Sequence, residues 1–316
     1  MGYIDLHCDY LYKLYKSLYF KNEKVVFQTD IAKLIQGNCI SQVFAILFNR
    51  YETKTLGEYY KCIIRLFDDF IISNSDKIAK ATSYNDIINN LNANKISAIL
   101  SLEDSQFLCE SGDNIEKLYN DGVRIAGLLW DGENDIGYSY KENKPLKKQG
   151  VEAIRNMEDT NIIIDVSHLS DEGFLDVARY TKKPFIASHS NARKLTNHRR
   201  NLTDEQIKII ADRGGIIGIN SFPKYIDLVQ INENSNSKIE YLIAHIKHIV
   251  KIGGEDCIAL GFDFDGMPNE VLDALEIKSA NHMDNFYEAL TSSFGENVTE
   301  KIFKSNALRF FKDNLK

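Results

Sequence analysis

Histidine and carboxylate side chains stand at the ends of several apolar runs in this sequence of 316 residues. They are His7, Asp9, Glu103, His168, His189 and Asp263. Imidazole nitrogens and carboxylate oxygens are the ligands that Zn²⁺ and related divalent metals take in proteins. Three carboxylates gathered at one place without a cation would repel one another, so the set predicts a site for two Zn²⁺ ions, or for Zn²⁺ with another divalent metal. Alternation along the first run puts His7 and Asp9 on the same side, where both can reach one ion.

The placement of these residues favours a metal site more strongly than their types do. A single histidine at the end of a strand is usually an ordinary hydrogen-bonded residue, and His-x-Asp alone is a pattern that arises by chance. Histidines and carboxylates at the ends of several separate runs are a coincidence that a metal site explains. We predict no metal role for the remaining histidines, which lie in a predicted helix, a basic loop or a polar segment: His198, His245, His248 and His282.

Eight short apolar runs are the elements that must position the candidate ligands. Most lack the alternation of a half-exposed strand, and helix-like stretches separate them, which indicates parallel strands buried on both faces. The runs are Gly2–Cys8, Ile40–Phe48, Ile96–Leu102, Val123–Leu129, Asn161–Ser167, Pro184–Ser188, Gly215–Asn220 and Cys257–Phe262. Eight strand–helix units fit a single α/β domain over residues 1–316, a (β/α)₈ barrel of the TIM type, in which the carboxyl ends of all strands meet at one face. An open doubly wound sheet is the alternative, but no Gly-x-Gly-x-x-Gly turn follows the first run.

Helices are predicted between the runs, where apolar residues recur at three- and four-residue spacing. Examples are Leu11/Leu14/Leu18 and Leu242/His245/Ile246/Ile249. The segment Thr203-Asp204-Glu205-Gln206 has the pattern of a capping box and therefore predicts the start of another helix.

Composition and charge exclude several classes of protein. The chain carries 38 Lys and Arg against 45 Asp and Glu, a net charge of −7, which disfavours a general nucleic-acid-binding role. The N-terminal residues lack the pattern of a signal peptide, and no apolar run is long enough to span a membrane. The five cysteines are scattered without a Cys-x-x-Cys pair, as is typical of reduced thiols. We therefore predict a cytoplasmic protein that binds neither nucleic acid nor membrane.

Several segments resemble the membrane (renal) dipeptidase family of zinc peptidases, within the amidohydrolase superfamily. They are Asp5-Leu6-His7-Cys8-Asp9, Ser101-Leu102-Glu103, Ile164–Ser170, Ala187–Ala192, Arg199–Leu202, Gly214-Gly215 and Gly261–Gly266, and Asn306–Phe311 is similar to the terminal helix of the family. Their order is that of the family from residue 5 to about residue 311. The sequences Asp-Val-Ser-His, Ser-His-Ser and Asp-Phe-Asp-Gly in this order form a specific signature. The stretch that contains Trp130 is similar to a bacterial, cytoplasmic branch of the family.

The resemblance implies a ligand set for two zinc ions. His7 and Asp9 would bind one zinc, Glu103 would bridge the pair, and His168 with His189 would bind the second. The chemistry of the residues agrees with this assignment, since bound zinc polarises a carbonyl and lowers the pKa of its water to about 7.

The resemblance also implies how a substrate would be bound and cleaved. Asp263 would hold the bridging water or hydroxide and transfer its proton, which a carboxylate beside that water can do. Arg200 would bind the terminal carboxylate of the substrate, since a guanidinium matches a carboxylate with two parallel hydrogen bonds.

Two residues depart from the family pattern. Trp130 occupies the position of a histidine that helps to stabilise the tetrahedral intermediate, and an indole can donate one hydrogen bond but cannot carry charge. Trp130 is therefore a candidate substrate-binding residue. Asp104 follows Glu103 where the family more often has glycine, and it would either alter the bridging geometry or add a ligand.

The predicted function is zinc-dependent hydrolysis of a dipeptide by a metal-bridging hydroxide. By resemblance, the family tolerates a D-configured C-terminal residue, so the predicted substrates include mixed L-D dipeptides, and a homodimer is implied. One alternative is a metal-dependent hydrolase of lactones, cyclic amides or esters on the same barrel. Another is a metal-binding protein that has lost catalysis, although the intact Asp263 argues against it, because a pure binding site has little need for a proton carrier.

Overall fold

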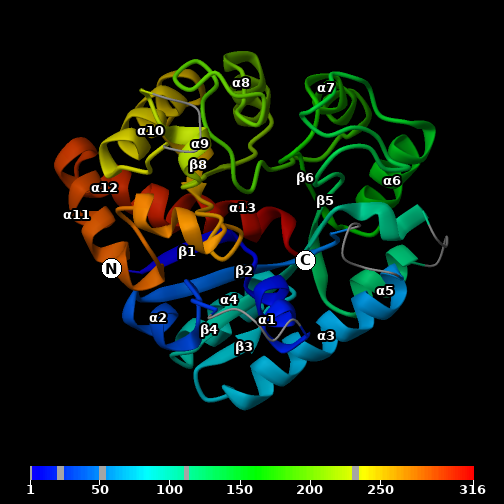
Figure 1. Cartoon of the computed structure of the whole chain (residues 1–316), viewed down its shortest axis with the longest axis horizontal. Helices are drawn as coiled ribbons and strands as arrows, with labels where there is room; N and C mark the ends of the chain where they lie inside the picture. Colours follow the sequence, from blue (N-terminus) through cyan, green and yellow to red (C-terminus); the bar gives the residue numbers. More distant parts are fainter. Residues whose placement is uncertain (1, 20–24, 50–54, 110–113, 230–234) are drawn as a thin grey trace.

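Parallel strands form the centre of the molecule, and helices lie around them (Figure 1). The computed structural model describes residues 2–19, 25–49, 55–109, 114–229 and 235–316. Within these residues the sheet has eight strands, in the order β6-β5-β4-β2-β1-β8-β7, with β3 paired to β4 outside this path. The strands are β1 Tyr3–Cys8, β2 Cys39–Leu47, β3 Ile78–Lys80, β4 Ile96–Glu103, β5 Val123–Gly127, β6 Ile163–Asp165, β7 Ile217–Ile219 and β8 Ile258–Leu260.

The helices connect the strands and cover their outer side (Figure 1). They are α1 Tyr10–Tyr19, α2 Ile31–Gln36, α3 Leu56–Ser73, α4 Tyr84–Asn92, α5 Asn114–Asn120, α6 Lys148–Asp159, α7 Asp171–Tyr180, α8 Asp204–Asp212, α9 Pro223–Ile226, α10 Ile239–Gly253, α11 Met283–Phe294, α12 Glu296–Glu300 and α13 Asn306–Asn314. Helix α8 begins at the predicted capping box, in which the Thr203 side chain accepts the Gln206 N–H and the Gln206 side chain accepts the Thr203 N–H. Helix α4 begins with the same arrangement at Ser83 and Asp86.

Two apolar layers hold the barrel together. The outer layer packs strands against helices and contains large, fully buried side chains such as Phe44 and Phe67. The inner layer contains residues from the first half of several strands, such as Ile4, and is continuous with Phe310 and Phe311 of α13. Helix α13 therefore closes the amino-terminal end of the barrel, which leaves the carboxyl ends of the strands for a functional site.

The segment 184–188 closes the ladder between β6 and β7 without forming a regular strand. It makes isolated parallel bridges, which join Asp165 to Ile186 and Ala187 to Ile217. The Ser188 carbonyl oxygen occupies the space that side chains would fill at Gly218 and Gly261, since a Cβ at these positions would lie 1.9 Å and 1.8 Å from it. The two glycines thus allow the backbone to enter the barrel just before His189.

The structure confirms the predicted (β/α)₈ barrel and differs from the prediction in individual elements. Seven of the eight predicted runs contain a strand, whereas Pro184–Ser188 makes only bridges because its end turns into the barrel. Strand β3 has no counterpart among the predicted runs. It pairs with the amino-terminal half of β4, whereas β5 pairs with the carboxyl-terminal half. Leu18, which the pattern places on the apolar face of the first helix, is 50% exposed.

Neither membrane spans nor disulfides were predicted from the sequence. In the part of the chain that the structure describes, no helix combines the length and apolar character that crossing a bilayer needs. All five cysteines are free thiols.

Candidate metal centre and active site

The candidate ligands come together at the carboxyl ends of the strands, as the barrel predicts. His7 lies near the end of β1, Glu103 is the last residue of β4, and Asp263 follows β8. His7 Nε2 lies 3.5 Å from Asp9 Oδ2, 3.5 Å from Glu103 Oε2 and 3.8 Å from Asp263 Oδ1. One imidazole nitrogen thus faces three carboxylates that come from different parts of the chain.

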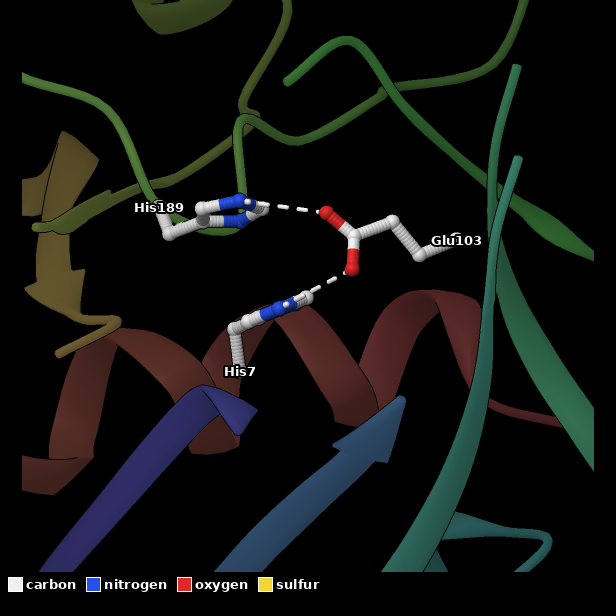
Figure 2. Close-up of side chains that lie close together, drawn as sticks. All are labelled: His7, Glu103 and His189. Carbon is white, nitrogen blue, oxygen red and sulfur yellow. Dashed lines mark ion pairs between the residues drawn. The ribbon is translucent and has the colours of Figure 1, made fainter. Parts of the chain in front are cut away.

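The Glu103 carboxylate lies between the histidines, as Figure 2 shows for His7 and His189. Its Oε2 faces His7, and its Oε1 lies 2.9 Å from His168 Nε2 and 3.7 Å from His189 Nε2. The Nε2 atoms of His168 and His189 are only 2.9 Å apart. The two oxygens of one carboxylate therefore face two different sets of imidazole nitrogens.

Five of the six candidate residues fall into two groups, in each of which one ligand atom per residue lies within 4.8 Å of the others; His168 is in neither group. The first contains His7, Glu103 and His189, and the second contains His7, Asp9 and Asp263. His7 belongs to both groups, so the two lie side by side within one buried cluster.

Burial and neighbouring charges shift pKa values of this cluster far from their usual range. Burial and, next to it, the charge of Asp9 raise the pKa of Glu103 to about 8. Burial lowers the pKa of His168 and of His189 well below the usual value. Burial also acts to lower the pKa of His7, but the Glu103 and Asp9 carboxylates outweigh it and raise this pKa well above its usual value. A divalent cation would favour anionic carboxylates and neutral imidazoles together.

Left-handed backbone conformations gather at this site. His168 and Asp263 have φ angles of 70° and 63°, and Asp104 and Asp265 have φ angles of 71° and 67°. Among the described residues, the other non-glycine positions with positive φ are Asn38, Asn94 and Asn161. Such residues cost about 1–3 kcal/mol each and persist where the surrounding structure holds them. The loops that carry two of the candidate ligands are therefore held by their contacts.

A buried chain of hydrogen bonds orients His189. Ser188 Oγ donates to Asp165 Oδ2 and lies 2.6 Å from His189 Nδ1. Asp165 Oδ1 also accepts the N–H groups of Ser167 and Ser188, both at 2.9 Å. Because the Ser188 hydroxyl proton goes to Asp165, its lone pairs accept Nδ1–H of His189, and His189 Nε2 keeps a free lone pair towards Glu103.

Replacing Ser188 with Ala is expected to weaken metal binding about tenfold to a hundredfold, the usual effect of losing a partner that orients a ligand histidine. Competition with a chelator of known affinity measures the change. Ser221→Ala is a matched control, because it also removes a buried hydroxyl, which donates to the Phe262 carbonyl. Equal losses of metal affinity in both variants would contradict the orienting role of Ser188.

Arg200 lies beside the cluster, although it is not among the described residues that line the cavity. Its side chain is buried, and Nη1 donates to Ser190 Oγ at 2.9 Å. Nε and Nη2 are buried without a hydrogen-bond partner in the described part of the chain. The guanidinium lies 5.8 Å from the ring centroid of Tyr225, which does line the cavity. Next to burial, the charge of Arg200 is the main cause that lowers the pKa of His168, which places this charge close to the cluster.

A cavity of about 560 Å³ lies at the cluster. Four of the candidate ligand and proton-transfer residues line it: Asp9, Glu103, His168 and Asp263. Trp130 lines it as well. Aromatic side chains form another part of its wall: Tyr12, Tyr140, Phe222 and Tyr225. This size and mixture of polar and aromatic groups suit a small organic molecule.

Sequence reasoning missed the residues that support the ligands. Asp5 accepts the backbone N–H groups of His7 and Phe262, and Asn220 Nδ2 donates to Asp263 Oδ2 at 3.0 Å. Asp5 stands two residues before His7, and a carboxylate so close to a ligand is a signal that the sequence contains. Asp165 acts through Ser188 on His189, in a separate segment, and no local spacing indicates this contact. Asn220 has no such signal, because its contact with Asp263 depends on the pairing of β7 with β8.

A buried cluster of histidines and carboxylates at the carboxyl-terminal mouth of a (β/α)₈ barrel is the arrangement of a metal-dependent hydrolase. A sequence profile described as membrane dipeptidase (peptidase family M19) matches residues 1–315, and the chain belongs to this family. It is therefore a metal-dependent dipeptidase, an enzyme that hydrolyses a peptide bond.

Individual relatives agree with this family. An uncharacterised protein from the pqqA 5′ region of Klebsiella pneumoniae is 32% identical over 212 residues, which cover 64% of this chain and 76% of that protein. An uncharacterised dipeptidase of Schizosaccharomyces pombe is 26% identical over 299 residues, or 84% of this chain and 69% of that protein. A metallopeptidase structure from Rhodobacter sphaeroides, liganded with a phosphinate mimic of the dipeptide L-Ala-D-Ala, has a TM-score of 0.87 and 18% identity over 99% of both chains. This likeness shows that the two proteins share a fold.

A metallopeptidase family implies a divalent metal, and the cluster fits one. His7 Nε2, Asp9 Oδ1 and Glu103 Oε2 are buried and have no hydrogen-bond partner among the described residues. Buried polar atoms are rarely left unpaired, because each loses its water without compensation. Buried imidazole nitrogen and carboxylate oxygen atoms without other partners are suitable ligands for zinc.

Proposed function

We propose that this dipeptidase holds two Zn²⁺ ions. His7 and Asp9 would hold one ion, His168 and His189 the other, and Glu103 would bridge them. The observation that carries this proposal is the Glu103 carboxylate, whose Oε2 faces His7 while Oε1 faces His168 and His189. When bound, such ions lower the pKa of a water molecule and polarise the scissile carbonyl.

Asp263 is the proposed proton carrier. Its Oδ2 accepts a hydrogen bond from Asn220, and its Oδ1 faces the cluster, 3.8 Å from His7 Nε2. Oδ1 would accept the proton of the attacking water and pass it to the nitrogen of the leaving amine. The oxygen of the water then remains on the carbonyl carbon, and the peptide C–N bond breaks.

Arg200 is proposed to bind the C-terminal carboxylate of the dipeptide. Two of its donors, Nε and Nη2, are buried and have no hydrogen-bond partner among the described residues. A carboxylate could accept hydrogen bonds from both donors at once. Trp130 is proposed to contact the substrate from the cavity wall. The mimic bound by the Rhodobacter sphaeroides relative is that of L-Ala-D-Ala, and we include mixed L-D dipeptides among the substrates.

Metal content and dipeptide hydrolysis, measured on one purified sample before and after chelation, test this function. We expect two zinc ions per chain, and cleavage of L-Ala-D-Ala that chelation abolishes and added Zn²⁺ restores. A single ion per chain would contradict the bridging role of Glu103. Two ions without cleavage of any dipeptide in a library would contradict the substrate class, and a panel of lactones and cyclic amides in the same assay would identify the alternative.

The homodimer and the cytoplasmic location stay predictions. The five free cysteines support a reducing compartment. Light scattering after size-exclusion chromatography measures the oligomeric state, and fractionation of the source cells measures the location.

A further inference from the structure

Asp104, the residue directly after Glu103, combines a buried carboxylate with a left-handed backbone. It is 2% exposed and has a φ of 71°. Glycine adopts this conformation without steric cost, and glycine is the residue that the family resemblance more often places here. An aspartate in this conformation needs contacts that hold it, and the carboxylate makes them.

The Asp104 carboxylate holds the segment that carries Trp130. Its Oδ2 accepts a hydrogen bond from the backbone N–H of Trp130 at 3.3 Å, and its Oδ1 accepts from Asn134 Nδ2 at 2.8 Å and from the backbone N–H of Gln106 at 3.0 Å. Asn134 in turn accepts the Ile136 N–H through its own Oδ1 at 2.8 Å, which fixes a turn in the same segment. Both oxygens of Asp104 are thus directed at this segment, and Asp104 belongs to neither group of clustered ligand atoms.

The segment between β5 and α6 depends on such contacts for its shape. Residues 128–147 form isolated bridges and turns but no helix or strand of their own. Where no backbone ladder sets the conformation, hydrogen bonds from side chains do so. Trp130 lies at the start of this segment and lines the same cavity as Glu103 and His168. The hydrogen bond from its backbone N–H to Asp104 is therefore one of the contacts that hold Trp130 at the cavity wall.

We propose that Asp104 is a positioning residue that fixes Trp130 as a wall of the substrate cavity and thereby strengthens dipeptide binding. The substrate in this inference rests on the proposed function, whereas the effect of Asp104 on Trp130 does not. The indole can contact an apolar part of the dipeptide and donate one hydrogen bond, but it cannot carry charge or transfer a proton. Asp104 therefore acts on binding and leaves the chemical step unchanged.

The single tryptophan of the chain makes this inference directly testable, because intrinsic tryptophan fluorescence reports on Trp130 alone. Asp104→Gly relieves the backbone but removes the carboxylate, so Trp130 emission should move to longer wavelength and its quenching by acrylamide should increase. For L-Ala-D-Ala, KM should rise about fivefold to tenfold with kcat within about twofold, the result of losing an interaction that is equal in ground and transition states. Asp104→Asn tolerates the left-handed backbone and keeps one oxygen, so it should restore part of both properties.

Two controls separate positioning from general stability. Ser83→Ala removes the N-cap of α4. Ser83 follows Thr82, whose carbonyl accepts a hydrogen bond from Arg124 Nε near the start of β5. The variant should therefore lower stability without changing Trp130 fluorescence or KM. In a Trp130→Ala background, Asp104→Gly should not raise KM further, because the residue through which it acts is gone.

Three results would overturn the inference. One is an Asp104→Gly variant that melts at a lower temperature but keeps wild-type fluorescence and KM, which would make Asp104 purely structural. Another is a fall in kcat with unchanged KM, which would mean that Asp104 acts through Glu103. If the wild-type protein cleaves no dipeptide at all, the proposed function fails, and unchanged fluorescence in Asp104→Gly would then overturn the positioning role by itself.

Discussion

Replacing Asp263 with Asn is expected to lower kcat for dipeptide hydrolysis about a thousandfold, within the range that general acid–base catalysis contributes. The amide has nearly the same shape as the carboxylate, and its oxygen can still accept the hydrogen bond from Asn220. It cannot take a proton from water and return it to the leaving amine. Steady-state kinetics on a mixed L-D dipeptide measures the loss, and elemental analysis of the same sample measures the zinc content.

The zinc content decides between two roles that the geometry allows for Asp263. Its Oδ1 lies in one group with ligand atoms of His7 and Asp9, so a carboxylate here could also bind a metal. A proton carrier predicts that Asp263→Asn keeps both ions, whereas loss of one ion would identify Asp263 as a ligand and contradict our assignment. Asn220→Ala is a graded control, since Asp263 keeps its carboxylate but loses the partner of Oδ2; we expect it to retain more activity than Asp263→Asn.

The barrel and the candidate ligands could be predicted because both have local signals in the sequence. Apolar runs predict the strands, and a strand end predicts which face of the barrel a side chain reaches. His7 and Glu103 lie at such ends, and the structure places His7 Nε2 3.5 Å from Glu103 Oε2 although the two residues are far apart in the chain. Helix α8 is another local case, since its capping box lies within four consecutive residues.

Other features of the site could not be predicted, because they depend on contacts between distant segments. The backbone before His189 enters the barrel only because Gly218 in β7 and Gly261 directly after β8 leave space for the Ser188 carbonyl. The positive φ angles of His168 and Asp263 are uncommon for any residue other than glycine, and no local pattern in the sequence signals them. The hydrogen bond between the Trp130 backbone N–H and Asp104 joins segments that follow two different strands, so no periodic pattern in the sequence indicates it.

Arg200 shows how far a residue type can be interpreted. The family resemblance implied a carboxylate-binding role for it, but among neighbouring arginines of a loop the sequence could not distinguish a buried side chain from a solvated one. The structure makes the distinction, since Arg200 is 3% exposed and buried whereas Arg199 is exposed. A buried guanidinium with two unpartnered donors carries a large free-energy cost that a bound anion would remove.

Replacing Arg200 with Lys is accordingly expected to lower kcat/KM for a dipeptide with a free C-terminal carboxylate about a hundredfold. Lysine keeps the positive charge beside His168 but lacks the planar fork that pairs two donors with one carboxylate. The loss corresponds to about 2.7 kcal/mol of transition-state stabilisation, a size typical of a lost hydrogen bond to a charged group. Initial rates at low substrate concentration measure kcat/KM directly.

The dipeptide amide, which has no terminal carboxylate, shows whether the loss arises at that group. Arg200→Lys should reduce hydrolysis of the free acid but leave the slower hydrolysis of the amide nearly unchanged, so the preference of the enzyme for the acid should largely disappear. Ser190 gives a second comparison, because it accepts from Nη1, whereas Nε and Nη2 have no partner in the described residues and are the donors proposed for the substrate. Ser190→Ala should therefore retain most of the preference. Equal losses for acid and amide in Arg200→Lys would mean that Arg200 supports the fold around His168, and the carboxylate-binding role would be wrong.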